Sequence, residues 1–310
     1  MSEPIIRVRN VSKTFQMGGG FGQKESFEAL RGISFDLHAG KTLALVGESG
    51  CGKSTVARLI TKVHDVTSGE ITFKGNNIDQ IQSGQALREY RSNVQMVFQD
   101  PFGSLNPAHT IAHHLARPIK IHNDVAGDAQ LLHRQQELLD MVELNADCLK
   151  KFPHQLSGGQ RQRINLARAL GVGAEMILAD EPTSMLDVSI RLGVLNLMQR
   201  MKSEMGIGFL YITHDLATAH YIAEETAVMY RGQIVEWGNT RDILTNPQHP
   251  YTKLLISAVP DPDLPFSDVI RESSQYSQDA ESTRLLSGRL QPDVNQVSEN
   301  HFVRDWESAA

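Results

Sequence analysis

The sequence predicts an α/β fold with a mostly parallel core sheet and an inserted helical subdomain. Three observations lead to this prediction. Short apolar runs of strand length alternate with segments whose apolar residues recur at helical spacing. A glycine-rich loop at residues 47–54 joins one such strand to a helix. Residues 108–150 carry helical patterns with no strand between them, which indicates helices inserted into the chain of a sheet.

The remaining elements follow from apolar spacing and turn residues. Strands are predicted at 5–15, 29–37, 41–46, 68–75, 93–98, 176–179, 208–213, 227–230 and 233–236. Helices are predicted at 55–60, 130–142, 161–170, 189–205 and 217–225. Residues 17–24 are glycine-rich and predict a hairpin loop, and Arg231-Gly232 predicts the turn of a closing hairpin. Residues 99–107 hold two prolines and a glycine, which favour a shaped loop.

Composition narrows the class of protein. The chain has 310 residues, with 40% hydrophobic and 21% charged residues, as in ordinary globular proteins. Its formal net charge is −6 and no basic block stands out, which argues against a dedicated nucleic-acid-binding protein. Cys51 lies inside the glycine-rich loop and Cys148 is the second cysteine, so a reduced compartment is expected. No apolar run approaches the ~18 residues that span a bilayer, and no signal peptide is expected.

The loop Gly47–Ser54 fits the phosphate-binding pattern G-x-x-x-x-G-K-[ST]. It follows an apolar strand and precedes a helix, which is the context that this motif requires. Glycines allow backbone N–H groups to turn toward phosphate oxygens, and the helix N-terminus adds partial positive charge. Lys53 is expected to reach the β- and γ-phosphates, and Ser54 is expected to bind Mg²⁺.

Two downstream segments carry side chains and backbone groups that suit the same phosphate chemistry. Asp180 and Glu181 end an apolar strand, where Asp180 suits Mg²⁺ and Glu181 suits polarisation of an attacking water. The segment Leu156-Ser157-Gly158-Gly159-Gln160 precedes a helix, with Ser157 as the expected N-cap, and predicts a second anion site. These letters are also the signature of the ATP-binding cassette family.

On these motifs, residues 5–260 resemble the nucleotide-binding subunit of an ATP-binding cassette transporter. The resemblance implies a P-loop NTPase cassette with an antiparallel β subdomain beside the parallel core. We assign residues 1–260 to this cassette, with the helical subdomain at about 100–170. Residues 261–310 are rich in Ser, Gln, Asp, Glu and Asn and are expected to form a polar tail, disordered or loosely packed.

The resemblance assigns roles residue by residue. Catalytic roles fall to Glu181, His214, Gln99 and Lys53, and the metal ligands would be Ser54, Gln99 and Asp180. Phe15 stands where the family places an aromatic ring on adenine, although that ring is usually tyrosine. Residues 184–187 match the loop that crosses to the second subunit. The residues expected to bind nucleotide are Phe15, Gly47, Glu48, Ser49, Gly50, Cys51, Gly52, Lys53, Ser54, Thr55, Ser157, Gly158, Gly159 and Gln160.

Residues 100–107 and 246–252 are similar to stretches of the oligopeptide and dipeptide importer branch. This resemblance implies ATP and Mg²⁺ as cofactors and an ATPase that powers peptide import. The implied partners are a second cassette ATPase, identical or different, two transmembrane permease subunits and, indirectly, an extracytoplasmic solute-binding protein, with no nucleic acid. The implied location is peripheral, on the cytoplasmic face of the inner (plasma) membrane. Two alternatives remain: the same machine for nickel or an oligosaccharide, and a soluble cassette ATPase without a transport role.

Three histidines could form a metal site separate from the phosphate loop. His109, His113 and His114 include an i, i+4 pair, as zinc ligands on a helix do. No acidic or cysteine partner follows at ligand spacing, so a solvated helix face is the favoured interpretation.

Overall fold

The structure is a computed structural model that describes residues 3–17, 25–122, 125, 127–257 and 287–306. In these residues one sheet has eight strands and a second has four. The larger sheet contains, in spatial order, β11 (Val294–Ser298), β12 (His301–Arg304), β10 (Gln233–Asn239), β9 (Glu225–Tyr230), β3 (Thr42–Val46), β8 (Gly208–Thr213), β7 (Met176–Asp180) and β6 (Val94–Val97). The smaller sheet contains β2 (Glu25–Leu37), β1 (Ile6–Met17), β4 (Ser68–Phe73) and β5 (Asn76–Asn77).

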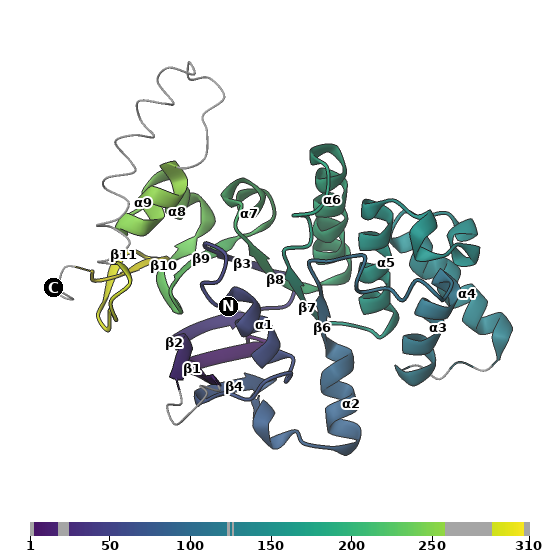
Figure 1. The fold of residues 1–310 in the computed structure, drawn as a ribbon, viewed down its shortest axis with the longest axis horizontal. Coiled ribbons are helices and arrows are strands. Elements are labelled where there is room, and N and C mark those ends of the chain that lie inside the picture. The colour runs from purple at the N-terminus through teal and green to yellow at the C-terminus, as the bar shows by residue number, and fades with distance from the viewer. Residues whose placement is uncertain (1–2, 18–24, 123–124, 126, 258–286, 307–310) are drawn as a thin grey trace, which may run out of the picture.

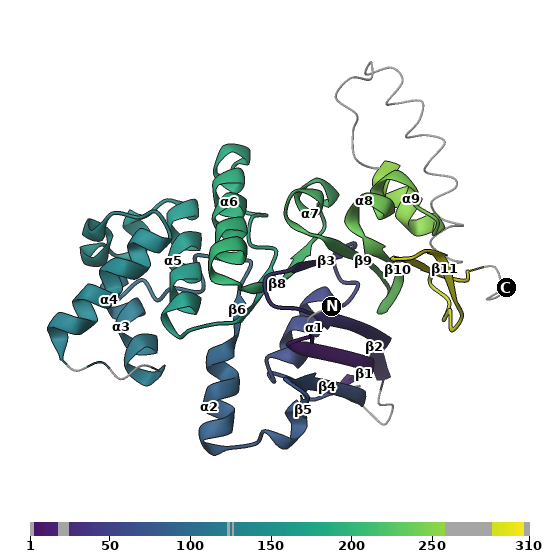
Figure 2. The ribbon, with the colours of Figure 1, turned by 180° about the vertical axis from the view of Figure 1, so that it is seen from behind.

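The helices gather mainly beside the larger sheet (Figure 1). The α-helices are α1 (Lys53–Ile60), α2 (Gly84–Asn93), α3 (Ile111–His122), α4 (Asp128–Met141), α5 (Gly158–Gly171), α6 (Val188–Met205), α7 (Leu216–Ile222), α8 (Thr240–Thr245) and α9 (Pro250–Ser257). Short 3-10 helices are η1 (Ile78–Gln80), η2 (Ala146–Lys150) and η3 (Pro153–Gln155). The helices α3, α4 and α5 form a separate group at one end of the molecule, as both views show (Figures 1 and 2). The predicted α/β class, with its parallel core, antiparallel sheet and inserted helices, is confirmed.

The middle of the larger sheet is parallel. Strand β3 pairs in parallel with β8 and β9, β8 pairs with β7, and β7 pairs with β6. Parallel neighbours end at the same edge, and ligands of open α/β sheets bind in the crevice outside that edge. The residues that follow these strands, among them Gly47, Gln99, Glu181 and His214, therefore start from one edge of the sheet.

Both faces of this sheet are buried, and β3 shows why the sequence allows it. Successive side chains of a strand point to opposite faces. Leu43 and Leu45 join a core with α1 and the smaller sheet, whereas Ala44 and Val46 join a core with the helices α3 to α7. A run of five buried apolar or small residues is what a central parallel strand requires. The phosphate loop therefore follows directly after a strand that is packed on both faces.

The predicted hairpin at the end of the cassette is also present. Strands β9 and β10 pair antiparallel, with Tyr230 opposite Gln233. Arg231 and Gly232 between them have φ angles of 42° and 82°. Positive φ at both central residues is the geometry of a two-residue turn that matches the twist of the flanking strands.

The C-terminal prediction needs a correction. Residues 287–306 do not form a loose solvated tail, because β12 pairs with β10 and β11 pairs with β12. Ser287, Gln291 and His301 are buried, and His301 bonds to the buried Glu236. The prediction was wrong because residues 287–306 are held by hydrogen bonds between polar groups. The spacing of apolar residues does not reveal such contacts. Residues 258–286, where the predicted boundary at 260 falls, lie outside the described residues, as does most of the predicted loop 17–24.

Helices α2, α8 and α9 were not predicted. In α2 the buried residues are Tyr90 and Asn93 alone, so no apolar stripe marks it in the sequence. In α8 and α9 only two residues each are buried. Short helices of this kind are stabilised by tertiary packing rather than by their own pattern.

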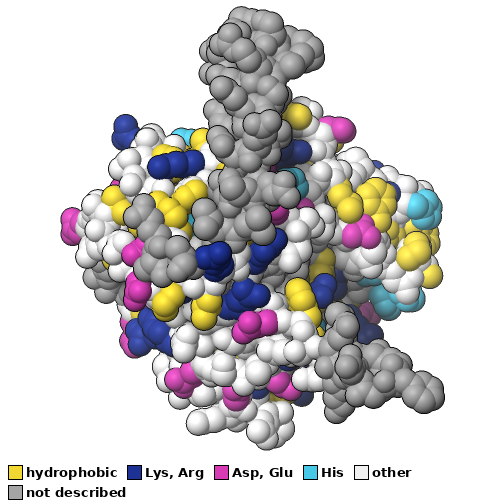
Figure 3. All heavy atoms as spheres, turned by 60° about the vertical axis from the view of Figure 1, so that its left-hand side comes forward, with side chains coloured by type: hydrophobic (Ala, Val, Ile, Leu, Met, Phe, Trp, Pro, Cys, Tyr) yellow, Lys and Arg dark blue, Asp and Glu magenta, His cyan; other side chains and the backbone are white. Residues whose placement is uncertain are grey.

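The face that carries the C-terminal strands is chemically mixed (Figure 3). Lys and Arg side chains gather near its middle, acidic side chains lie both next to them and farther out, and hydrophobic patches are small and separated. Among the described residues, no helix combines the length and apolarity needed to cross a bilayer.

Candidate nucleotide site

The loop Gly47–Ser54 connects β3 to α1, as predicted. Gly52 has φ 112°, and a Cβ there would lie 2.7 Å from the Ala29 carbonyl oxygen. A Cβ on Gly47 would lie 2.1 Å from the Met229 carbonyl oxygen. Any larger residue at either position would push the loop away from β2 or β9. Gly52 is also the N-cap of α1 and provides no side-chain cap, so the first N–H groups of that helix point into the loop without a capping side chain.

Lys53 lies beneath this loop with only 5% of its surface exposed. Its Nζ donates to the carbonyl oxygens of Gly47 at 2.6 Å and Glu48 at 2.8 Å. The Cys51 Sγ lies 3.8 Å from Nζ and is a weak acceptor. Burial raises the pKa of the Cys51 thiol, although the charge of Lys53 opposes that shift. The ammonium is therefore held by two strong acceptors and one weak one that a phosphate oxygen can replace.

Two of the three predicted metal ligands, Ser54 and Asp180, meet at the start of α1, whereas the amide of Gln99 contacts Glu181. Ser54 Oγ donates to Asp180 Oδ1 at 3.1 Å, and Asp180 is buried at the end of β7. Burial raises the pKa of the Asp180 carboxyl, the Ser54 hydrogen bond lowers it, and the neighbouring charge of Glu181 raises it. A bound cation would offset the raised pKa, and hydroxyl and carboxylate oxygens are the ligands that Mg²⁺ accepts.

Two predicted catalytic side chains converge on one carboxylate oxygen of a third. Gln99 Nε2 donates to Glu181 Oε2 at 3.1 Å, and His214 Nδ1 lies 3.2 Å from the same oxygen. Gln99 follows β6, Glu181 follows β7 and His214 follows β8, so the convergence is made by adjacent parallel strands. Glu181 has φ 44°, a strained value for a residue with a side chain, and its N–H donates to the Ile212 carbonyl at 2.9 Å.

The segment Ser157–Gln160 begins α5, as predicted. Gln160 N–H donates to Ser157 Oγ at 3.3 Å, and Ser157 N–H donates to Gln160 Oε1 at 3.0 Å, which completes a capping box. A Cβ on Gly159 would lie 2.2 Å from Ile190 Cγ2, so this segment packs against α6. It lies in the helical group and not beside α1, so one chain does not bring the two predicted anion sites together (Figure 1).

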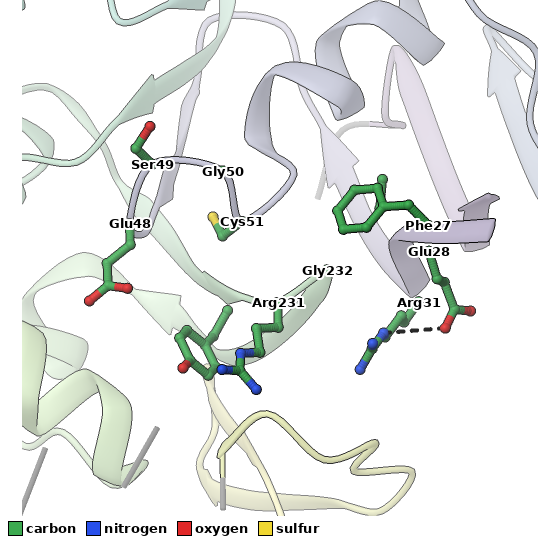
Figure 4. Close-up of a pocket in the computed structure, with 11 residues that line it drawn as sticks. Phe27, Glu28, Arg31, Glu48, Ser49, Gly50, Cys51, Arg231 and Gly232 are labelled. Atoms are coloured by element: carbon green, nitrogen blue, oxygen red, sulfur yellow. Dashed lines mark ion pairs between the residues drawn. The ribbon is translucent and has the colours of Figure 1, made fainter. Parts of the chain in front are cut away.

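A pocket of about 450 Å³ lies beside the phosphate loop (Figure 4). Loop residues 48–51 form one wall, and the β9–β10 turn and the N-terminal half of β2 form the others. Phe27 is 50% exposed and lines it together with Arg31 and Arg231, which sequence reasoning missed. An ion pair of 3.3 Å joins Arg31 to Glu28. A volume above 300 Å³ is typical of small-molecule sites.

Phe15 does not line this pocket, but it lies next to a residue that does. Phe15 pairs directly with Phe27 across β1 and β2, and directly opposed residues of such a pair point to the same face. The Phe15 ring packs edge-on against His64 with centroids 5.3 Å apart, and Lys13 Nζ lies 5.0 Å from its centre. Adenine stacking by Phe15 stays a prediction.

Two of the three histidines stack on each other, and the ring of the third lies edge-on to both. His109 precedes α3, and its ring lies 4.0 Å from that of His113. His114 Nε2 lies 3.0 Å from the Asn106 carbonyl oxygen. In the part of the chain that the structure describes, no group of three or more His, Cys, Asp or Glu side chains has the arrangement of a metal site.

Comparisons with known proteins agree with this geometry. Residues 30–184 match the family described as ABC transporter, and residues 235–283 match the family described as Oligopeptide/dipeptide transporter, C-terminal region. The chain is 41% identical over 303 residues to the oligopeptide transport ATP-binding protein OppF of Bacillus subtilis, covering 98% of this chain and 96% of the relative. It is 40% identical over 314 residues to the dipeptide transport ATP-binding protein DppF of Lactococcus lactis, covering 100% and 97%.

A solved structure is similar in fold as well. The ATP-binding cassette MJ0796, solved as a dimer in a post-hydrolysis state bound to ADP and Pi, superposes with a TM-score of 0.67 at 28% identity. The superposition covers 76% of this chain and 99% of that chain.

Proposed function

The chain belongs to the ABC transporter family, and from this premise we propose that its ATP hydrolysis powers the import of oligopeptides or dipeptides through a membrane transporter. It is an ATPase of the ABC type. The observation that carries the choice of solute is the similarity to peptide-transport ATP-binding proteins over nearly the whole chain, including the C-terminal region. Nickel or an oligosaccharide would use the same ATPase, because solute-selecting residues belong to other subunits.

In this proposal the phosphate loop and Lys53 bind the triphosphate. Backbone N–H groups at the start of α1 face the phosphates, and Lys53 moves its third donor from Cys51 to a phosphate oxygen. Ser54 and Asp180 would hold Mg²⁺. Gln99, whose amide donates to Glu181 in this structure, would be a further ligand. Mg²⁺, when bound, neutralises charge on the β- and γ-phosphates.

Hydrolysis needs a placed water as well as charge neutralisation. We assign Glu181 as the group that polarises this water. Gln99 and His214 both contact its Oε2, which fixes the direction of the carboxylate. His214 is 57% exposed at its side chain, so it can turn from Glu181 toward a γ-phosphate without unfolding its surroundings.

The second half of the ATP site would come from another subunit. Ser157–Gln160 is displaced from the phosphate loop of its own chain. Its glycines approach Leu186 and Ile190, and Met185 and Val188, which are nearby in the sequence, are 54% and 79% exposed. We infer a head-to-tail dimer, with an identical chain or a sister ATPase, in which this segment caps the ATP of the partner. Two transmembrane permeases and, indirectly, a solute-binding protein would complete the machine. The chain would sit peripherally on the cytoplasmic face of the inner (plasma) membrane.

Affinity purification from native membranes in mild detergent tests the proposal. Two multi-span proteins together with a cassette ATPase are the expected partners, and the complex in proteoliposomes should hydrolyse ATP faster when a peptide-loaded binding protein is added. Glu181→Gln in the same complex should bind ATP without turnover. Recovery of soluble partners, ribosomes or nucleic acid alone would favour the soluble ATPase instead. If nickel or an oligosaccharide, but no peptide, stimulated ATP hydrolysis, that compound would replace peptides as the proposed solute.

A further inference from the structure

In the phosphate loop, the peptide unit between Gly47 and Glu48 is hydrogen-bonded through both its C=O and its N–H group. The carbonyl oxygen of Gly47 accepts from Lys53 Nζ at 2.6 Å. The N–H of Glu48, in the same peptide unit, donates to the Tyr251 hydroxyl oxygen at 3.0 Å. Because a peptide unit is planar and its N–H and C=O point in opposite directions, the two bonds together fix its rotation. Tyr251 thereby sets the direction of the carbonyl that holds Lys53.

Tyr251 is well suited to this task because it hardly moves. It is 1% exposed, lies in the first turn of α9, and packs against Tyr230 with ring centroids 4.2 Å apart. Its hydroxyl group comes from outside the loop, because Tyr251 lies 203 positions after Glu48 in the sequence. Burial raises the pKa of Tyr251, so the phenol stays neutral and its oxygen remains a hydrogen-bond acceptor for an N–H group.

A buried polar chain holds α9 in turn. The Tyr251 N–H donates to His249 Nδ1 at 3.1 Å, and His249 Nε2 lies 3.1 Å from Gln291 Oε1. These two contacts fit one neutral imidazole, with the proton on Nε2. Burial lowers the pKa of His249 to about 4, which keeps that neutral form near pH 7. His249 is fully buried, so the chain is shielded from water.

The same chain ends on the C-terminal strands. Glu236 of β10 accepts from the N–H groups of Gln248 at 2.7 Å and His249 at 3.0 Å, and its Oε1 lies 2.7 Å from His301 Nε2 of β12. Gln291, just before β11, donates its N–H to Gln233 Oε1 of β10 at 2.9 Å. The segment 287–306 therefore fixes the position of α9 through buried hydrogen bonds, each of which would leave an unpaired polar group if broken.

We propose that Tyr251 is a positioning residue for nucleotide binding, which orients the Gly47–Glu48 peptide and through it Lys53, and that the C-terminal strands hold Tyr251 in place. The inference rests on the proposed use of Lys53 in triphosphate binding. It gives the C-terminal segment a role in the ATP site that its place at the far edge of the sheet does not suggest.

The test compares two buried tyrosines in the full chain. Tyr251→Phe removes the hydroxyl and keeps the ring against Tyr230. Tyr90→Phe is the matched control, since Tyr90 is also 1% exposed and its hydroxyl donates to the Ile60 carbonyl at the far end of α1. Calorimetric titration with ATP and ADP should give a dissociation constant about 3- to 10-fold higher for Tyr251→Phe, as for loss of one hydrogen bond. Tyr90→Phe should change it less than about twofold, with a similar fall in melting temperature.

A double-mutant cycle asks whether the effect passes through Lys53. In a Lys53→Met background, Tyr251→Phe should change the ATP dissociation constant less than about twofold, because the group that it orients is gone. Multiplicative effects of the two substitutions, or unchanged affinity in Tyr251→Phe, would overturn the inference. Failure of the unsubstituted chain to bind ATP would instead overturn the proposed function. Should Tyr251→Phe unfold, Gln291→Met carries the same test with the phenol intact and an expected rise of about twofold.

Discussion

The phosphate loop and the segment Ser157–Gln160 are both glycine-containing helix starts, yet they are built differently. The phosphate loop is enclosed by β2 and β9, holds the buried Lys53, and lies beside Asp180. Ser157–Gln160 caps its own helix, carries no cation, and approaches a segment, residues 185–190, that has exposed apolar side chains. In the proposed function the first binds most of the triphosphate, and the second acts only when a partner subunit covers it.

This difference has a simple origin in the sheet. The phosphate loop follows a central strand, and the segments after β8, β7 and β6 on one side of it carry the proposed catalytic groups. The start of α5 belongs to the inserted helices and has α6 as its neighbour. In the proposed function, one chain thus carries the two halves of an ATP site at separate places, and association with a second subunit would join them.

The largest expected effect separates chemistry from binding. Glu181→Gln should lower ATP hydrolysis by about 10²- to 10⁴-fold, because the amide cannot take a proton from water. The ATP dissociation constant of the isolated chain should stay within about twofold, since Lys53 and the loop are untouched. Phosphate release and calorimetric titration measure the two quantities. Hydrolysis within tenfold of the original rate would remove Glu181 from its assigned role.

Ser157→Ala tests whether the segment Ser157–Gln160 serves its own chain or a partner. Hydrolysis in the assembled transporter should fall about tenfold, while ATP affinity of the isolated chain should not change, because the segment serves the ATP of a partner. Loss of the cap costs about 1 kcal/mol of stability, so Asn239→Ala, which removes the cap of α8, is the matched control. Equal loss of affinity in the isolated chain would mean that the segment acts within its own subunit.

A smaller effect is expected from the C-terminal strands. Gln291→Met removes the acceptor of His249 Nε2 and should raise the ATP dissociation constant about twofold, by loosening α9 beneath Tyr251. Gln296→Met, on the exposed strand β11 of the same hairpin, should leave it unchanged. If the two variants bound ATP with the same affinity, the C-terminal strands would have no effect on the phosphate loop.

The smallest effect at neutral pH concerns His249. Burial lowers its pKa to about 4, while the hydrogen bond with Gln291 and the charge of Glu236 act in the opposite direction. The unfolded chain, with a histidine pKa of ~6.5, binds the proton more tightly, so stability is full above pH 6.5 and is lost as the pH falls toward 4. Urea unfolding at pH 7, 6 and 5 should show this loss, and His249→Gln should flatten it. An equally steep decline in His249→Gln would assign the pH dependence to other groups.

The sequence predicted correctly those features that depend on contiguous residues. The loop 47–54 and the capped segment 157–160 were found because each motif is local, and the structure places both at helix starts. Sequence reasoning failed for α2, for α9 and for residues 287–306, where packing rests on a few buried residues or on polar contacts. Phe27, Arg31 and Arg231 were missed for a similar reason: their only common feature is the pocket that they line.

The phosphate loop, the acidic strand end, the alternation of strands and helices, and the family are all recognisable in the amino-acid sequence. Each depends on neighbours a few positions apart, and such patterns survive without three-dimensional information. Tertiary structure alone decided that Gln99 and His214 meet at one oxygen of Glu181, and that Tyr251 reaches the Glu48 amide from 203 positions away. Those contacts depend on strand order and on helix docking, because a hydrogen bond forms only where folding has brought donor and acceptor within about 3 Å.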